Sequence, residues 1–144
     1  MQEIKIVRST TNSLPMYATQ GAAGLDLAAN ISAPIRIKPN ARVAIPTGIS
    51  IALPTGYEAQ VRSRSGLAIK HGIACLNAPG TIDSDYRGEI LVLLINHGQV
   101  EFEITHGMRI AQLIIAKYEH ITWLQVSQLD DTKRSTDGFG STGV

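Results

Sequence analysis

The chain has 144 residues, a formal net charge of +1 and a hydrophobic fraction of 44%. This length fits one domain with its own core, and this composition excludes wholesale disorder. The near-zero net charge argues against a protein that binds nucleic acid through a basic face or tail.

The single cysteine excludes an internal disulfide and favours a reducing compartment. The polar first ten residues lack the apolar core of a secretory signal. No segment approaches the ~18 consecutive apolar residues that a membrane-spanning helix needs. We therefore expect a cytoplasmic protein with no membrane partner.

Alternation of apolar and polar residues predicts short β-strands along most of the chain. The alternating segments, in chain order, are 3–8, 35–39, 42–53, 57–63, 100–104 and 121–127. Turn signals containing Pro, Gly or Asn separate many of them. Many short strands with regular turns are typical of an all-β sandwich or barrel.

Three segments depart from this pattern. The run "ILVLLI" (90–95) suits a strand buried on both faces, and "SGLAIKHG" (65–72) is the one helix candidate. In that helix Ser65 would be the N-cap and Gly72 would follow the C-terminus. The polar, glycine-rich end of the chain indicates an arm rather than a second domain. We expect a β-barrel domain over 1–128 and a flexible arm over 129–144.

Two internal stretches combine residues that could carry chemistry. In "RSRSGLA" (62–68) Arg64, Ser65 and Gly66 lie at the start of the expected helix and could bind an anion. The alternative is a capped helix with a solvated arginine. In "LNAPGTIDSDYRGEILV" (76–92) Asp83 could orient a water as a general base. The alternative is a loop in which Asp and Gly make turns.

The C-terminal stretch places one of only two phenylalanines, Phe139, between glycines. Its ring could stack on a base, and Arg134, Ser141 and Thr142 could bind phosphate. The alternative is a frayed terminus. The four histidines are scattered and expected on the surface, and Cys75 is expected to be a buried small hydrophobe.

Five motifs in this sequence, taken in order, closely resemble those of the homotrimeric dUTPases, which hydrolyse dUTP to dUMP and pyrophosphate. They are "AGLDLAA" (23–29), "RSRSGLA" (62–68), "LNAPGTIDSDYRGEI" (76–90), "GMRIAQLII" (107–115) and "RSTDGFGSTG" (134–143). The resemblance implies a jelly-roll-like (β-clip) barrel that forms a homotrimer, with active sites at subunit interfaces. It also implies a role in limiting uracil incorporation into DNA and in supplying dUMP for thymidylate synthesis. The strand at 90–95 would then pack both in the barrel and against a threefold neighbour.

The resemblance also implies a role for each matching residue. Asp83 matches the general base, and Asp26 matches the carboxylate that holds waters of a Mg²⁺ ion carried by the triphosphate. The phosphate contacts would be Arg64, Ser65, Gly66 and Gln112. The uracil and deoxyribose contacts, in a hairpin from Asn77 to Leu91, would be Asn77, Thr81, Ile82, Tyr86 and Leu91, with the Tyr86 ring excluding a 2′-hydroxyl. The arm residues Arg134, Phe139, Gly140, Ser141 and Thr142 would close over the nucleotide at another subunit's site.

Two departures from the family pattern carry expectations of their own. Ser63 stands where the family usually has proline, which predicts a less rigid turn. Ser135 and Asp137 stand where the family arm usually has glycine, and Asp137 would weaken closure over the γ-phosphate unless it points to solvent. Two other functions remain open: a dCTP deaminase on the same fold, and a catalytically idle relative that binds nucleotide or a partner as a regulator.

Overall fold

The structure is a computed structural model that describes residues 3–138 of the chain. It contains eleven β-strands and one helix within that range. They are β1 (Lys5–Arg8), β2 (Leu25–Ala28), β3 (Ile35–Ile37), β4 (Arg42–Pro46), β5 (Ile49–Ala52), β6 (Tyr57–Arg62), α1 (Ser65–His71), β7 (Ile73–Cys75), β8 (Gly80–Ile82), β9 (Leu91–Asn96), β10 (Phe102–Ile104) and β11 (Arg109–Lys117). The mostly-β class and the single short helix are therefore confirmed.

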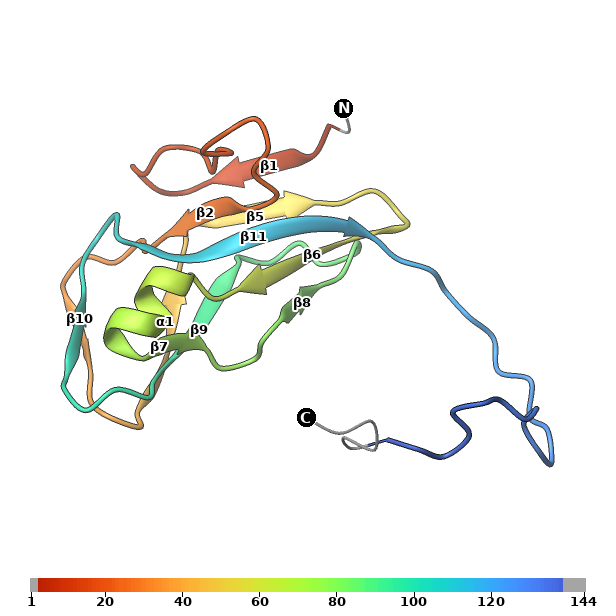
Figure 1. The fold of residues 1–144 in the computed structure, drawn as a ribbon. Coiled ribbons are helices and arrows are strands. Elements are labelled where there is room, and N and C mark those ends of the chain that lie inside the picture. Colours follow the sequence, from red (N-terminus) through yellow and green to blue (C-terminus); the bar gives the residue numbers. More distant parts are fainter. Residues whose placement is uncertain (1–2, 139–144) are drawn as a thin grey trace.

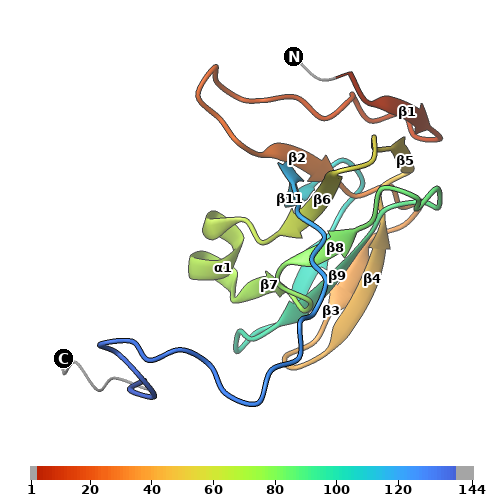
Figure 2. The ribbon, with the colours of Figure 1, turned by 90° about the vertical axis from the view of Figure 1, so that its right-hand side faces the viewer.

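The strands pair antiparallel in four small sheets (Figures 1 and 2). The largest has the order β2-β11-β6-β8, and a three-stranded sheet has the order β4-β9-β7. Two further pairs, β1 with β5 and β3 with β10, complete the barrel. Most neighbours in the sheets are distant in sequence, so these pairings bring separate motifs together.

The core consists of the alternate side chains of these strands. Leu27, Ile45, Val92, Leu94 and Ile104 are fully buried, as expected when one face of each strand packs inward. The strands expected near 3–8, 35–39, 42–53, 57–63 and 100–104 are all present. In most of them one face is buried, and period-two alternation reports that face; β1 is the exception, because all four of its residues are exposed.

The prediction that 90–95 is a strand buried on both faces is wrong for the single chain. In β9 the side chains of Val92 and Leu94 are buried, whereas Leu91 and Leu93 on the other face are 48% and 36% exposed. No other part of the described chain covers that face fully. The strand thus presents an apolar face to its surroundings.

The strand expected at 121–127 is absent from the structure. β11 ends at Lys117, and the chain then leaves the barrel without helix or strand up to residue 138 (Figure 1). The side chains of Ile121, Trp123, Leu124 and Val126 are all exposed. Alternation makes a segment suitable for a sheet, but a strand also needs a backbone partner, and the described chain offers none here.

The helix α1 has nearly the predicted bounds but not the predicted cap. Arg64 occupies the N-cap position with extended backbone and no capping side-chain hydrogen bond, so Ser65 is the first helical residue. Gly72 ends the helix in the left-handed conformation, with φ of 68°. No helix among the described residues is long and apolar enough to cross a membrane.

Candidate functional site

One face of the four-stranded sheet carries a row of polar side chains. Gln112 of β11 lies between its pairing partners Asp26 of β2 and Arg62 of β6. Because directly opposed residues share a face of the sheet, the three side chains point the same way. They line a pocket of about 790 Å³ together with residues at the start of α1. We call this the basic pocket; its charged and polar lining residues are Asp26, Arg62, Arg64, Ser65, Lys70, His71, Arg109 and Gln112.

A β-bulge in β11 adds Arg109 to this row. Arg109 is paired with Ala28 and Ala111 with Leu27, so Ile110 is an extra residue in the strand. Strict alternation would place Arg109 and Gln112 on opposite faces. With the bulge, Ile110 and Ala111 are both buried, and Arg109 and Gln112 share the pocket face.

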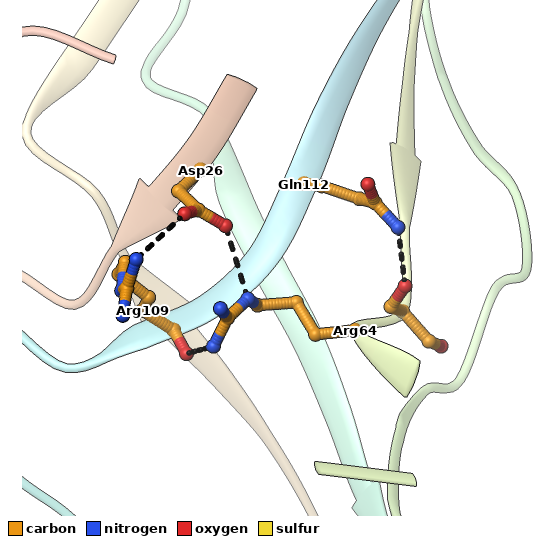
Figure 3. Close-up of polar contacts among 5 residues, drawn as sticks. Asp26, Arg64, Arg109 and Gln112 are labelled. Atoms are coloured by element: carbon orange, nitrogen blue, oxygen red, sulfur yellow. Dashed lines mark hydrogen bonds and ion pairs between the residues drawn. The ribbon is translucent and has the colours of Figure 1, made fainter. Parts of the chain in front are cut away.

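Asp26 lies between two guanidinium groups (Figure 3). Its Oδ1 is 3.0 Å from Nε of Arg64, and its Oδ2 is 3.2 Å from a terminal nitrogen of Arg109. Arg64 also donates a hydrogen bond of 3.1 Å to the backbone carbonyl of Arg109. Arg109 therefore holds both Asp26 and Arg64. No role was predicted for Arg109 from the sequence, because its place on this face depends on the bulge.

Gln112 is held from two sides. Its Nε2 donates a hydrogen bond of 2.9 Å to the carbonyl oxygen of Ser63 (Figure 3). A Cβ at Gly24 would lie 2.5 Å from the Gln112 Oε1, so a larger residue there would have to displace the end of the Gln112 side chain. The Ser65 hydroxyl and the exposed Gly66 lie on the same wall of the basic pocket.

A second, smaller pocket of about 310 Å³ lies around the connection from β8 to β9. We call it the loop pocket; its lining residues are Asn77, Thr81, Ile82, Asp83, Tyr86, Glu89, Ile90, Leu91 and Leu93. The predicted hairpin is not formed, because β8 pairs with β6 whereas β9 pairs with β4 and β7. The segment 83–90 instead crosses from one sheet to the other. As an edge strand, β8 keeps backbone groups along its outer side that no strand in the described chain pairs.

The Tyr86 ring is fixed by its own loop. Its hydroxyl donates a hydrogen bond of 2.9 Å to the Glu89 carbonyl, and its N–H donates to the Asp83 carbonyl at 3.2 Å. The ring packs over Gly88, where an added Cβ would lie 2.6 Å from the Tyr86 Cζ. Glu89 is anchored in turn, because its Oε1 accepts a hydrogen bond of 2.6 Å from the N–H of Gly48. Neither Gly88 nor Glu89 was singled out from the sequence.

The structure thus gathers the predicted site residues into two groups rather than one. Asp26, Arg64, Ser65, Gly66 and Gln112 line the basic pocket, and Asn77, Thr81, Ile82, Asp83, Tyr86 and Leu91 line the loop pocket. Among the described residues, the two pockets share no lining residue.

The arm residues belong to neither group. Arg134 is exposed and donates a hydrogen bond of 2.9 Å to the Asp137 carbonyl. Phe139, Gly140, Ser141 and Thr142 lie outside the described residues.

The expectations for the cysteine and histidines are confirmed. Cys75 is 4% exposed, and burial raises the pKa of its thiol, with a smaller opposing effect from its contact with Ser63. All four histidines are exposed.

The described residues contain no cluster of three or more His, Cys, Asp or Glu side chains that could enclose a metal ion. The basic pocket offers one carboxylate, Asp26, beside two arginines. This donor set does not suit an all-protein cage. It does fit Mg²⁺ that keeps its waters and binds mainly through substrate phosphates.

Comparisons with known proteins identify the family. The sequence model for dUTPase matches residues 10–143. The deoxyuridine 5′-triphosphate nucleotidohydrolase of Orientia tsutsugamushi (strain Ikeda) is 58% identical over 134 residues, covering 93% of this chain and 90% of the relative. That of Rickettsia massiliae (strain Mtu5) is 59% identical over 142 residues, covering 99% and 96%. These matches identify the chain as an enzyme of the nucleotidohydrolase class. More particularly, it belongs to the dUTPase family.

The fold agrees with this assignment. The dUTPase of Staphylococcus bacteriophage 80alpha, solved with dUpNHpp, superposes with a TM-score of 0.89 over 100% of both chains at 22% identity. A second structure, a mutant dUTPase of the S. aureus phage phi11, superposes with a TM-score of 0.79 over 88% of this chain and 98% of that one, at 19% identity. At these identities the likeness concerns the fold.

Proposed function

We propose that this protein hydrolyses dUTP to dUMP and pyrophosphate. The observation that carries the proposal is the pair of pockets: one offers cations and an amide for a triphosphate, and the other offers a carboxylate, a ring and an unpaired strand edge for a nucleoside. We further propose that this activity, in the cytoplasm, limits uracil incorporation into DNA and supplies dUMP for thymidylate synthesis.

Asp83 is the general base in this proposal. It follows β8 directly and is exposed to the loop pocket, so a water can reach its carboxylate. The water oxygen bonds to the α-phosphorus as its proton passes to Asp83. The bond from the α-phosphorus to the bridging oxygen breaks, and pyrophosphate leaves with the electron pair. General-base catalysis of this kind contributes about 10²–10⁴-fold.

The basic pocket receives the triphosphate. Arg64 offers a forked cation, and Ser65, Gly66 and Gln112 offer a hydroxyl, a backbone N–H and an amide. Arg64 is paired with Asp26, and Arg109 contacts the same carboxylate. When Arg64 turns to a phosphate, Arg109 still holds the Asp26 carboxylate in position.

Mg²⁺ enters with the substrate in this proposal. Asp26 would hold waters of the ion, in agreement with the single carboxylate of the basic pocket. The ion supplies neutralisation of the phosphate oxygens when bound. A structural Mg(II) ion is named for the related mutant dUTPase of phage phi11.

Uracil is selected by the edge of β8. In uracil the N3–H donor lies between two carbonyl acceptors, whereas cytosine has an acceptor at N3 and a donor at N4. Backbone groups at Thr81 and Leu91, with Ile82 beside them and the Asn77 amide, would match uracil and leave groups unpaired against cytosine. Each unpaired group costs about 1–3 kcal/mol. The Tyr86 ring would pack on the deoxyribose and exclude a 2′-hydroxyl.

The complete site is formed between copies of the chain, in a homotrimer. Two observations support this: the two pockets share no described residue, and large apolar side chains are exposed on two segments. These segments are the outer face of β9 and residues 121–126, which the rest of the described chain covers only in part. Large apolar side chains exposed close together along one segment are typical of an interface.

The barrel would comprise residues 1–128 and the arm 129–144. In the proposed closed state Phe139 stacks on uracil, while Gly140, Ser141, Thr142 and Arg134 close over the γ-phosphate of another subunit's site. Such closure excludes water and aligns the triphosphate.

The test is a product assay with dUTP or dCTP and Mg²⁺. We expect dUMP and pyrophosphate from dUTP. Ammonia from dCTP would indicate a deaminase, and nucleotide binding without turnover would indicate a regulator. Asp83→Asn should bind the imido analogue dUpNHpp as the wild type does but lose most turnover. If this variant retains more than about a third of the wild-type kcat, Asp83 is not the base.

A further inference from the structure

We propose that Ser63 is a positioning residue for the basic pocket, and that its hydroxyl holds the loop carrying Arg64 against the neighbouring sheet. This inference rests on the proposed function, because it concerns the groups that would bind the triphosphate. It assigns a role to a residue that departs from the proline implied by the family resemblance.

Ser63 accepts two hydrogen bonds from different parts of the fold. Its Oγ accepts the backbone N–H of Cys75 at 2.8 Å, and its carbonyl accepts Nε2 of Gln112 at 2.9 Å. Cys75 ends β7 in the three-stranded sheet, whereas Gln112 belongs to β11 in the four-stranded sheet. One residue thus ties together two sheets and the start of α1.

Strand β7 is the fixed partner in this arrangement. Cys75 is paired with Leu94 of β9, and the next N–H, that of Leu76, donates to the Leu93 carbonyl at 2.9 Å. Residues 63 and 64 lie between the end of β6 and the start of α1, outside any ladder. Loss of the Ser63 contact should therefore loosen the loop rather than β7.

The hydroxyl matters because Cys75 is a buried residue and Ser63 is half-buried, so the hydrogen bond between them is partly shielded from solvent. Cys75 is 4% exposed, and a buried N–H without an acceptor is unfavourable. Serine and threonine side chains can accept this hydrogen bond, whereas alanine and proline side chains have no acceptor. The sequence predicted a less rigid turn at Ser63, because serine lacks the ring that restricts the proline backbone. In the structure the hydrogen bond from the Cys75 N–H to the Ser63 hydroxyl holds this turn instead.

The experiment compares Ser63→Ala and Ser63→Thr with the wild type, using two probes that separate the pockets. Pyrophosphate tests the basic pocket, and deoxyuridine tests the loop pocket. For Ser63→Ala we expect the Kd of pyrophosphate to rise about fivefold to tenfold, which corresponds to the loss of one hydrogen bond. The Kd of deoxyuridine should stay within about twofold, because β7 and β8 keep their ladders. Amide hydrogen exchange at Cys75 should accelerate in the same variant.

Ser63→Thr keeps the hydroxyl and should restore both the pyrophosphate affinity and the protection of the Cys75 amide. Ile104→Val, a change in a fully buried residue that lines neither pocket, controls for a general loss of stability. The inference is overturned if Ser63→Ala binds pyrophosphate like the wild type, if both probes weaken equally, or if Ser63→Thr behaves like Ser63→Ala. Hydrolysis of dUTP by the wild type is measured separately, so that failure of the proposed activity is distinguished from failure of the Ser63 role.

Discussion

Replacing Gly88 with alanine should relax the choice of sugar without touching any group that contacts the phosphates. An added Cβ would lie 2.6 Å from Cζ and 3.0 Å from Cε2 of Tyr86, and it would also meet the tyrosine hydroxyl. Ring atoms cannot approach a methyl group so closely, so the ring must turn away. The hydrogen bond from the hydroxyl to the Glu89 carbonyl, 2.9 Å long, should then break.

The expected change in sugar preference follows from two costs, the broken hydrogen bond and the displaced ring. A hydrogen bond of this kind contributes about 0.5–1.5 kcal/mol. A side chain forced about 30° from its rotamer costs about 0.5–1.5 kcal/mol. If the sum, about 1–3 kcal/mol, acts against the position in which the Tyr86 ring excludes ribose, the preference for dUTP over UTP should fall by about fivefold to 150-fold.

The assay is the ratio of kcat/KM for dUTP to that for UTP, with the melting temperature recorded for each variant. Gly21→Ala is a matched control, since nothing lies within 4 Å of a Cβ at that position. Tyr86→Phe keeps the ring and loses only the hydrogen bond to Glu89, so its preference should fall less than that of Gly88→Ala, whereas Tyr86→Ala should lose most of the preference. A folded Gly88→Ala variant with an unchanged ratio would refute the reasoning, because the ring would then not be what excludes the 2′-hydroxyl.

Arg109→Met should weaken dUpNHpp binding only about twofold to fivefold, because the Arg109 side chain is 61% exposed and solvent screens its ion pair with Asp26; a loss above about 100-fold in titration calorimetry would mean that Arg109 itself binds phosphate. Burial raises the pKa of Cys75, so the folded state favours the protonated thiol. The free energy of unfolding should therefore not depend on this thiol below the pKa that it has in the unfolded chain. Above that pKa the free energy of unfolding should fall as the pH rises. Denaturant titrations at a series of pH values should show this slope in the wild type and not in Cys75→Ala. Deletion of residues 134–144 should leave the melting temperature unchanged but reduce kcat/KM at least about 100-fold, through lost stacking and alignment. Mixing this truncated chain with full-length Asp83→Asn chains should restore activity if arms cross between subunits; no recovery despite proven subunit exchange would exclude a crossed arm.

The sequence predicted those parts of the fold that depend on a local period. Alternation identified β3, β4, β5, β6 and β10, because the burial of one strand face leaves a signal of period two. The same rule failed at 121–127, where Trp123 and Leu124 are exposed, since alternation does not say whether a partner strand exists in the same chain. β9 was predicted from its apolar run and is present, but the run does not show that Leu91 and Leu93 on its outer face are exposed in the single chain.

The candidate site was predicted residue by residue but not in its arrangement. The motifs named the members of both pockets, yet the division into two groups depends on long-range pairings such as β11 with β2 and β6. Arg109 was missed because its place on the pocket face depends on the bulge, and a bulge is invisible to a pattern of fixed period. Gly88 and Glu89 were missed because they act through Tyr86.

The bulge in β11 also sets a limit on how this gene can change over generations. Arg109 and Gln112 are three positions apart, and they share a face only because the bulge adds one residue between them. Loss of a single codon between them would remove the bulge and one of the two buried side chains, Ile110 or Ala111. Gain of one beside the retained bulge would turn Arg109 or Gln112 to the opposite face, whereas exchange of either side chain would leave the other in place. We expect inherited length variation to be absent between 109 and 112 and to occur instead at open turns such as Gly56, where a Cβ would meet nothing within 4 Å.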